Sequence, residues 1–310
     1  MSLALLFPGQ GSQFVGMGRD LAEAFPVAAD TFREADEVLG LPLSRLMWEG
    51  PEKELVLTQN AQPAILVHSV AALRIGEEHL EAPALAAGHS LGEFSAHVAA
   101  GTLNFADALQ AVRRRGELMY EAGTRRPGTM AALLGLDDDA AEDLCRGVSR
   151  GPDSVVVPAN LNSTGQVVIS GDVDAVERAQ QAAPEAGARR VVPLNVSGAF
   201  HSPLMAPAQE GLQAFLDHVE MRDPRFPVIS NVTAGAVETA VDARELLVRQ
   251  LTSPVRWSAS VTTMLERGVT EFVEFGPGSV LTGLNRRNAR GVSSRACGTT
   301  DEVASLSEHA

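Results

Sequence analysis

Cysteine and long apolar runs are scarce in this sequence, and each shortage excludes a class of protein. The two cysteines, Cys145 and Cys297, lie far apart and follow no CxxC pattern, so we expect neither a disulfide framework nor a structural metal site. No apolar run is long enough to span a bilayer, and the first residues show neither the basic segment nor the cleavage site of a signal peptide. These absences predict a cytoplasmic protein that does not enter a membrane.

Positive charge is also scarce. The net charge is −14, and Lys53 is the only lysine. Binding to nucleic acid needs clustered positive charge, so we do not expect a nucleic-acid partner. The arginines form local clusters, which are more typical of solvated helix faces than of binding sites; they lie at 113–115, 125–126, 189–190 and 286–287.

The chain has the length and composition of an α/β protein. It has 310 residues, of which 45% are apolar and 21% charged, so it forms one large domain or two unequal ones. Short apolar segments alternate with helical periodicity. A helix is predicted over 18–39, and a helix over 62–78, with Pro63 near its start, precedes a strand over 84–90.

The segment 125–195 has a pattern of its own. In chain order it predicts strand 129–136, helix 138–148, strand 154–162, strand 165–171, helix 172–187 and strand 188–195. The order βαββαβ is that of a ferredoxin-like module. We therefore expect a small ferredoxin-like subdomain over 125–195, inserted in a hydrolase-like domain with a parallel-sheet core formed by 1–124 and 196–310.

A single serine lies between two glycines in the stretch GHSLGEFSA, which begins at Gly88. A G-x-S-x-G turn between a strand and a helix strains its serine, and glycines at the neighbouring positions leave room for the crossing backbone. The N–H of Leu91 then points toward an oxyanion that forms when Ser90 attacks a carbonyl. The stretch predicts a nucleophile, and an ordinary turn is the alternative.

A nucleophilic serine needs a base within about 3 Å. His89 adjoins Ser90 and points away from it in such a turn, and His97 lies seven residues further along the helix, about 10 Å away. His201 lies instead in the loop NVSGAFHSPLM, where the chain returns from the predicted insertion, and catalytic residues concentrate in such loops. His201 is the candidate base, and a loop histidine bonded to the backbone is the alternative.

No acidic residue between Ser90 and His201 lies in a recognisable motif, so we expect a backbone carbonyl in the third role of the site. A carbonyl fixes the tautomer of the histidine but stabilises its protonated ring less than a carboxylate does. Such a site suits an intrinsically reactive acyl donor, for example a thioester, better than an amide.

Arg115 is expected on the apolar face of the helix that Asn104 caps. It continues the apolar row of Ala108, Val112 and Met119. A charge on a buried row needs an anionic partner, which is either a protein carboxylate or the carboxylate of a substrate. The spacing leaves both open.

The segment FPGQGSQ follows the first predicted strand and matches neither the GxGxxG fingerprint nor a P-loop. It lies at the carboxyl edge of the sheet, where one of its N–H groups could supply a second oxyanion donor. A purely structural turn is the alternative.

Six features occur in order along nearly the whole chain, namely LFPGQGSQ, GHSLGEFSA, Arg115, GAFHSPLM, LVRQLTSPVRW and EFGPGSVLTGL. Together they resemble the malonyl-CoA:acyl carrier protein transacylase family. The resemblance implies transfer of malonyl from malonyl-CoA to the phosphopantetheine thiol of acyl carrier protein through a malonyl-serine intermediate, feeding fatty acid synthesis. It implies no cofactor or metal, CoA as a product, and acyl carrier protein as the partner of a monomer.

The resemblance also implies a role for each site residue. Ser90 would be the nucleophile and His201 the base, oriented by the backbone carbonyl of Gln250. The remaining roles are two oxyanion N–H donors and a clamp for the malonyl carboxylate, which fall to Gln10, Leu91 and Arg115. The sequence AFH, which contains Phe200, resembles the sequence at this position in malonyl-selective members of the related polyketide acyltransferases.

Three other functions remain open at this point. A stand-alone polyketide acyltransferase has the same motifs. A serine esterase or thioesterase shares the turn at Ser90, but it requires an acid between the serine and the histidine and has no use for Arg115. A scaffold protein with an inactive site would have no need of an intact Ser90 and His201.

Overall fold

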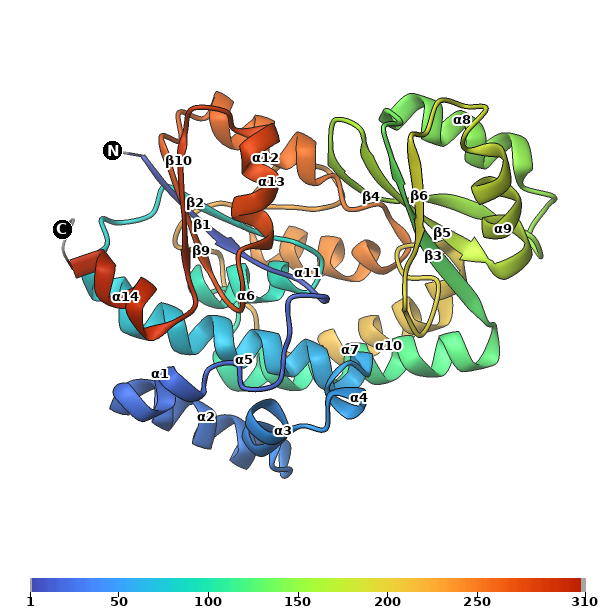
Figure 1. The fold of residues 1–310 in the computed structure, drawn as a ribbon. Helices are drawn as coiled ribbons and strands as arrows, with labels where there is room; N and C mark the ends of the chain where they lie inside the picture. The colour runs from blue at the N-terminus through green and yellow to red at the C-terminus, as the bar shows by residue number, and fades with distance from the viewer. Residues whose placement is uncertain (1, 308–310) are drawn as a thin grey trace.

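The computed structural model describes residues 2–307, which form two β-sheets (Figure 1). The larger sheet has six strands in the described chain. In spatial order they are β10 (Ser293–Cys297), β9 (Glu271–Phe275), β1 (Leu3–Phe7), β2 (Leu85–Gly88), β7 (Val228–Ile229) and β8 (Ala236–Val237). Neighbouring strands are parallel except β7 and β8. The predicted parallel-sheet core is therefore confirmed.

Helices cover both faces of this sheet (Figure 1). They are α1 (Arg19–Ala24), α2 (Pro26–Leu39), α3 (Leu43–Glu49), α4 (Glu52–Leu55), α5 (Thr58–Gly76), α6 (Gly92–Ala99), α7 (Phe105–Arg125), α10 (Ala206–Leu216), α11 (Ala240–Arg249), α12 (Trp257–Glu266), α13 (Val280–Asn288) and α14 (Thr300–Ser307). None of the described helices is both long and apolar enough to cross a membrane.

The side chains of β1 alternate between the two faces of the sheet, and all of them are buried. Leu3, Leu5 and Phe7 belong to one apolar cluster with α5 and α7. Ala4 and Leu6 belong to a second cluster with α12 and α13. A strand buried on both faces is typical of a parallel sheet between two layers of helices.

The single helix predicted over 18–39 is wrong, because the chain forms α1 and α2 there. Phe25 separates the two helices in an extended conformation (φ −127°, ψ 119°), and Pro26 is the first residue of α2. The ring of a proline disfavours the helical conformation for the residue before it but suits the first helical position. The proline therefore ends one helix and begins the next.

The start of α5 also differs from the prediction, since the helix begins at Thr58 and Pro63 lies inside it. A proline in a helix cannot donate to the carbonyl four residues earlier, which here belongs to Gln59. That carbonyl accepts a hydrogen bond from Arg113 Nη1 of α7 instead, at 3.0 Å. The arginine of the neighbouring helix thus replaces the missing donor.

The smaller sheet is antiparallel, with the strand order β4-β5-β3-β6. Its elements in chain order are β3 (Gly128–Leu134), α8 (Asp138–Val148), β4 (Val156–Ser163), β5 (Gln166–Asp172), α9 (Val173–Ala182) and β6 (Arg190–Pro193). The predicted order βαββαβ is confirmed, and its two helices pack on the sheet in a separate apolar cluster. The boundaries at 125 and 195 remain a prediction.

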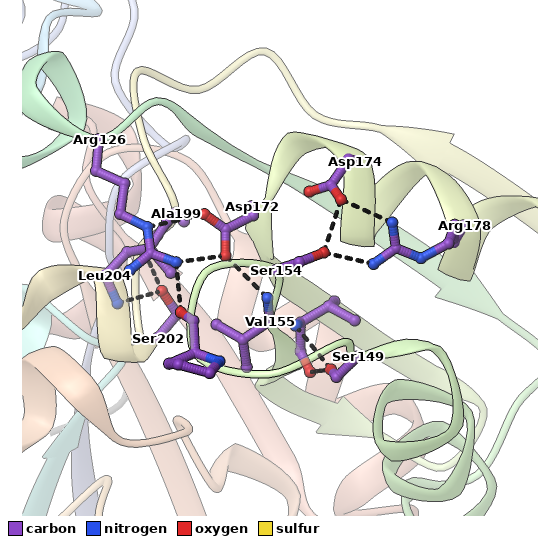
Figure 2. Close-up of polar contacts among 12 residues, drawn as sticks. Arg126, Ser149, Ser154, Val155, Asp172, Asp174, Arg178, Ala199, Ser202 and Leu204 are labelled. Carbon is purple, nitrogen blue, oxygen red and sulfur yellow. Dashed lines mark hydrogen bonds and ion pairs between the residues drawn. The ribbon is translucent and has the colours of Figure 1, made fainter.

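An ion pair and its hydrogen bonds connect the chain to the smaller sheet at the point where α7 ends. Figure 2 shows Arg126 facing Asp172, and the guanidinium donates to both carboxylate oxygens at 2.8 and 2.7 Å. The same carboxylate accepts from the N–H of Val155, and Arg126 also donates to the carbonyl of Pro152. Such a bidentate pair fixes direction as well as distance, so it ties the end of α7 to the smaller sheet.

Candidate active site

Ser90 lies at the sharp turn between β2 and α6 and has a positive φ of 51°. A left-handed backbone is rare for a residue other than glycine and is found where the surrounding structure holds it in place. A Cβ on Gly88 would collide with the backbone of Gly92, and a Cβ on Gly92 would collide with the carbonyl of Phe7. The two glycines therefore permit the turn that lifts the serine above the sheet.

His201 lies within hydrogen-bond distance of Ser90 and also has a positive φ, of 57°. Its Nε2 is 2.7 Å from Ser90 Oγ, and its Nδ1 is 2.9 Å from the carbonyl oxygen of Gln250. A carbonyl can only accept, so Nδ1 carries the hydrogen and Nε2 of the neutral ring is free to accept the serine proton. The structure brings these three residues together in the order that proton abstraction needs.

Burial keeps the His201 ring neutral. It lowers the pKa of His201 to about 3, and the nearby positive charge of Arg115 adds to this effect. The ring is therefore uncharged at neutral pH and available as a base. The same environment makes its protonated form costly unless a negative charge develops nearby.

Arg115 is buried, with 1% of its surface exposed, and its guanidinium lies beside the serine. Nη1 donates to Gln62 Oε1 at 2.7 Å, and Nη2 donates to Gln250 Oε1 at 2.8 Å and to Ser90 Oγ at 3.1 Å. Burial lowers the pKa of Arg115 to about 10, so the group stays charged at neutral pH. All of its partners are neutral.

The structure tests one of the two partners that the sequence left open for Arg115, which is a carboxylate of the protein itself. Within residues 2–307, no carboxylate oxygen lies within the 4.0 Å of a salt bridge to this arginine, although Glu93 is near enough to raise its pKa. Its Nε is buried without a hydrogen-bond partner in the described chain. A buried cation whose hydrogen-bond partners are all neutral lacks the anionic partner that would compensate its burial.

One cavity of 380 Å³ joins the predicted residues. Its lining includes Gln10, Ser90, Leu91, Arg115 and His201. Gln250 lies behind His201 and is fully buried. The smaller sheet and its return loop complete the wall, with Met130, Asn160, Leu194, Asn195, Val196 and Phe200.

The backbone around Ser90 leaves two N–H groups available. The N–H of Ser90 itself donates to Asn231 Oδ1 at 2.6 Å, so it is already used. The N–H groups of Gln10 and Leu91, which both line the cavity, donate to no acceptor in the described chain. The side chain of Gln10 is held by the hydroxyl of Thr58, at 2.9 Å.

The sequence interpretation missed three polar residues around the serine. Asn231, Glu93 and Gln62 are buried and bond to the backbone of Ser90, to Gln250 and to Arg115 respectively. Glu93 gave a usable signal, because it is an acidic residue in a helix whose other residues are apolar apart from Ser95 and His97. Gln62 and Asn231 gave none, since each meets the site only through the fold.

The two histidines nearest to Ser90 in sequence do not serve as its base. His89 Nε2 is 2.8 Å from Asn162 Oδ1, and the ring lies against Trp257. Both ring nitrogens of His97 are buried without partners in the part of the chain that the structure describes. In that same part, no group of three or more His, Cys, Asp or Glu side chains could hold a metal ion.

Comparison with known proteins agrees with this geometry. Residues 4–303 match the acyl transferase domain family. The malonyl CoA-acyl carrier protein transacylase of Bacillus subtilis is 50% identical over 92% of this chain and 90% of its own, and that of Escherichia coli K12 is 48% identical over 92% of each.

Solved structures are equally similar. An acyl carrier protein S-malonyltransferase from Vibrio cholerae superposes with a TM-score of 0.94 at 45% identity, covering 99% of this chain and 100% of the other. A malonyl-transacylase solved in complex with a type II polyketide synthase acyl-carrier protein superposes with a TM-score of 0.95 at 45% identity, and the superposition covers 100% of each chain. The chain belongs to the malonyl CoA-acyl carrier protein transacylase family.

Proposed function

We propose that the protein transfers malonyl from malonyl-CoA to the phosphopantetheine thiol of acyl carrier protein, feeding fatty acid synthesis, through a malonyl ester on Ser90. The observation that carries the proposal is the buried guanidinium of Arg115, whose hydrogen-bond partners are all neutral, in the lining of a cavity shared with Ser90 and His201. A hydrolase of neutral esters has no need of a buried cation beside its nucleophile, whereas a malonyl thioester brings a free carboxylate.

In the first half-reaction, Ser90 Oγ attacks the thioester carbonyl and its proton passes to His201 Nε2. The N–H groups of Gln10 and Leu91 are proposed to receive the carbonyl oxygen as it becomes negative; in support, neither donates to an acceptor in the described chain and both residues line the cavity. When the carbon–sulfur bond breaks, the CoA sulfur leaves as a thiol with the proton from His201. The product is malonyl-Ser90 and free CoA.

The second half-reaction reverses these roles. His201 removes the proton from the phosphopantetheine thiol, the sulfur attacks the ester carbonyl of malonyl-Ser90, and the proton returns to Ser90 Oγ. The carbonyl of Gln250 keeps Nε2 facing the reacting atoms in both directions. A carbonyl in this role is sufficient because a thioester is a reactive acyl donor.

Arg115 is proposed to choose the donor. A charge-assisted hydrogen-bonded pair contributes roughly 1.5 to 3 kcal/mol, which is about tenfold to a hundredfold in preference for a donor with a carboxylate. Phe200, which also lines the cavity, is proposed to narrow the space beside the malonyl C2. The reaction as proposed needs no cofactor, and a monomeric state and a cytoplasmic location remain predictions.

The test is the release of CoA without acyl carrier protein. Mixing enzyme with excess malonyl-CoA should release about one CoA per enzyme and then stop, and labelled CoA should exchange into malonyl-CoA. Addition of acyl carrier protein should restart release. Continuous release of CoA without an acceptor would indicate a thioesterase and contradict the proposal.

A second candidate is malonyl transfer to the carrier protein of a polyketide synthase. It is favoured by the similarity to the malonyl-transacylase solved with a type II polyketide synthase carrier protein. The two functions are separated by the ratio of kcat/KM for the two kinds of carrier protein, measured with the same malonyl-CoA. A higher value for the fatty acid carrier is expected, and a higher value for the polyketide carrier would replace the first candidate with the second.

A further inference from the structure

We infer that Glu93 is a positioning residue, which holds the strained turn of Ser90 in its reactive geometry through Asn231 and Gln250. The inference rests on the proposed function in taking Ser90 as the nucleophile. Glu93 touches neither Ser90 Oγ nor the ring of His201 in the described hydrogen bonds. Its carboxyl group acts through the backbone N–H of Asn231 and the side chain of Gln250.

Glu93 lies in α6, three residues after the serine, and is fully buried. Its Oε2 accepts from Gln250 Nε2 at 2.6 Å and from the backbone N–H of Asn231 at 3.2 Å. The carboxyl group therefore joins the carboxyl end of β7 to the residue after α11. These two segments are close to the serine only in the folded chain.

Asn231 clamps one side of the turn. Its Oδ1 accepts the N–H of Ser90 at 2.6 Å, and its Nδ2 donates to the carbonyl of Gly88 at 2.7 Å. The side chain thus spans the peptide groups on both sides of His89. A left-handed residue persists only where its surroundings fix it, and this clamp is one such restraint.

Gln250 clamps the other side of the turn. Its Nε2 donates to the carbonyl of Ser90 at 2.9 Å as well as to Glu93, and its Oε1 accepts from Arg115. Its backbone carbonyl holds His201. The acceptor on Glu93 therefore fixes the orientation of the one residue that bonds to the nucleophile's backbone, the base and the arginine.

A role in packing alone does not account for Glu93. Its Oε1 is buried without a partner in the described chain, and burial raises the pKa of its carboxyl group to about 7. Burying a carboxyl group that is not ion-paired costs stability, and an apolar side chain at this place would avoid the cost. What Glu93 supplies is an acceptor at a fixed position for two donors.

Two variants separate the effect of the length of the Glu93 side chain from the effect of its carboxyl charge. Glu93→Gln keeps the length of the side chain and an acceptor oxygen but removes the carboxyl group, whereas Glu93→Asp keeps the carboxyl group and withdraws it by one methylene. The readout is the rate at which Ser90 reacts with a small fluorophosphonate, because this reaction needs neither malonyl-CoA nor Arg115. Saturating acylation by malonyl-CoA and acetyl-CoA is measured beside it.

We expect Glu93→Asp to react about tenfold to a hundredfold more slowly with all three reagents, since a displacement of about 1 Å at a reacting group costs that much. Glu93→Gln should stay within about fivefold of the wild-type rate. The matched control is Glu274→Asp, another buried carboxyl group, which accepts two backbone N–H groups at the start of α13. It should lose thermal stability without slowing the fluorophosphonate reaction.

A Glu93→Asp variant that unfolds cooperatively and reacts at the wild-type rate would overturn the inference. A Glu93→Gln variant that reacts as slowly as Glu93→Asp would also overturn the inference, because the charge of the carboxyl group would then matter and not the length of the side chain. If Glu93→Asp does not fold, a folded Glu93→Gln variant that reacts more than about tenfold more slowly than the wild type would still overturn the inference. A wild-type Ser90 that reacts with the fluorophosphonate but takes no malonyl group would contradict the proposed function alone.

Discussion

The two sheets meet at one cavity but bring different kinds of groups to it. The carboxyl edge of the parallel sheet, with its helices and loops, supplies the serine, the histidine and the arginine. The antiparallel sheet and the residues directly after β6 supply mainly apolar side chains and amides, such as Met130, Asn160 and Leu194. Reactivity is thus concentrated in one region, and the other region provides enclosure and shape.

The regions also differ in how their polar groups are satisfied. Around Ser90, buried groups from segments more than 130 residues apart are joined in one hydrogen-bonded network. In the smaller sheet, two ion pairs that Figure 2 shows, Arg126 with Asp172 and Arg178 with Asp174, each have one partner with a substantially exposed side chain. Removing one member of a buried network leaves partners unpaired, so we expect the larger losses in the first region.

The largest expected effect is that of Ser90→Ala, which removes the nucleophile. Malonyl transfer should fall by about 10⁴-fold or more, because no other group can form the acyl intermediate. Transfer is measured as malonyl-acyl carrier protein formed per minute. Ser95→Ala is the control, since this buried serine of α6, the helix that follows Ser90, has no hydrogen-bond partner for its hydroxyl in the described chain. Equal losses in the two variants would contradict the role of Ser90.

Next in size is the effect of Arg115→Ala on the choice of donor. We expect kcat/KM for malonyl-CoA to fall about tenfold to a hundredfold, while acetyl transfer stays the same or rises. Arg114→Ala, which changes a half-exposed neighbour paired with Glu117 and Glu121, should alter neither value. An equal loss for both donors in Arg115→Ala would show that the arginine supports the chemistry and not the choice.

A change in the smaller sheet should act on binding and stability more than on chemistry. Met130→Ala enlarges the cavity, so KM should change by less than about tenfold and kcat by less than about threefold, while the free energy of unfolding falls by roughly 2 to 5 kcal/mol. Met264 is a buried residue of α12 that does not line the cavity, so Met264→Ala should match the loss of stability without a change in KM. A large drop in kcat for Met130→Ala would erase the difference between the regions.

The smallest effect on activity, but a distinct one on stability, is predicted for His97→Leu. Burial lowers the pKa of His97 to about 3. The unfolded chain therefore binds more protons than the folded chain between pH 6.5 and pH 3, and this histidine costs stability as the pH falls. The free energy of unfolding of His97→Leu, taken relative to that of the wild type, should therefore increase by on the order of 3 kcal/mol from pH 7 to pH 4.

Urea unfolding at a series of pH values checks this prediction, with His79→Leu as the control for an exposed histidine. A pH dependence shared by both variants would contradict it. Residues 125–195 contain no histidine. The buried histidines with a lowered pKa, His68, His89, His97 and His201, all lie outside this segment, so hydrogen exchange at pH 4 should increase first in the parallel-sheet region.

Features with a local cause could be predicted from the sequence. Asn104 caps α7 and accepts the N–H of Asp107, as its place before a helical pattern suggested. The order βαββαβ follows from short-range periodicity, and the turn at Ser90 follows from its two glycines. The candidate site residues were also found together, because their motifs are short and keep their order along the chain.

Features that depend on distant contacts could not be predicted. Asn231 and the side chain of Gln250 meet Ser90 across 141 and 160 positions, and nothing in their own neighbourhoods indicates it. β10 was missed because its sequence, SSRAC, has little β-propensity and only its last residue is fully buried. It is a strand because β9 offers it a parallel partner at the edge of the sheet.

Intact-protein mass after mixing with malonyl-, methylmalonyl- or acetyl-CoA tests the central claim most directly. The account predicts a lasting adduct of one malonyl group from malonyl-CoA, located on the peptide that contains Ser90, absent in Ser90→Ala and removed by acyl carrier protein. It predicts a weak adduct or none from acetyl-CoA in the wild type. No adduct from malonyl-CoA, or one that persists in Ser90→Ala, would contradict it.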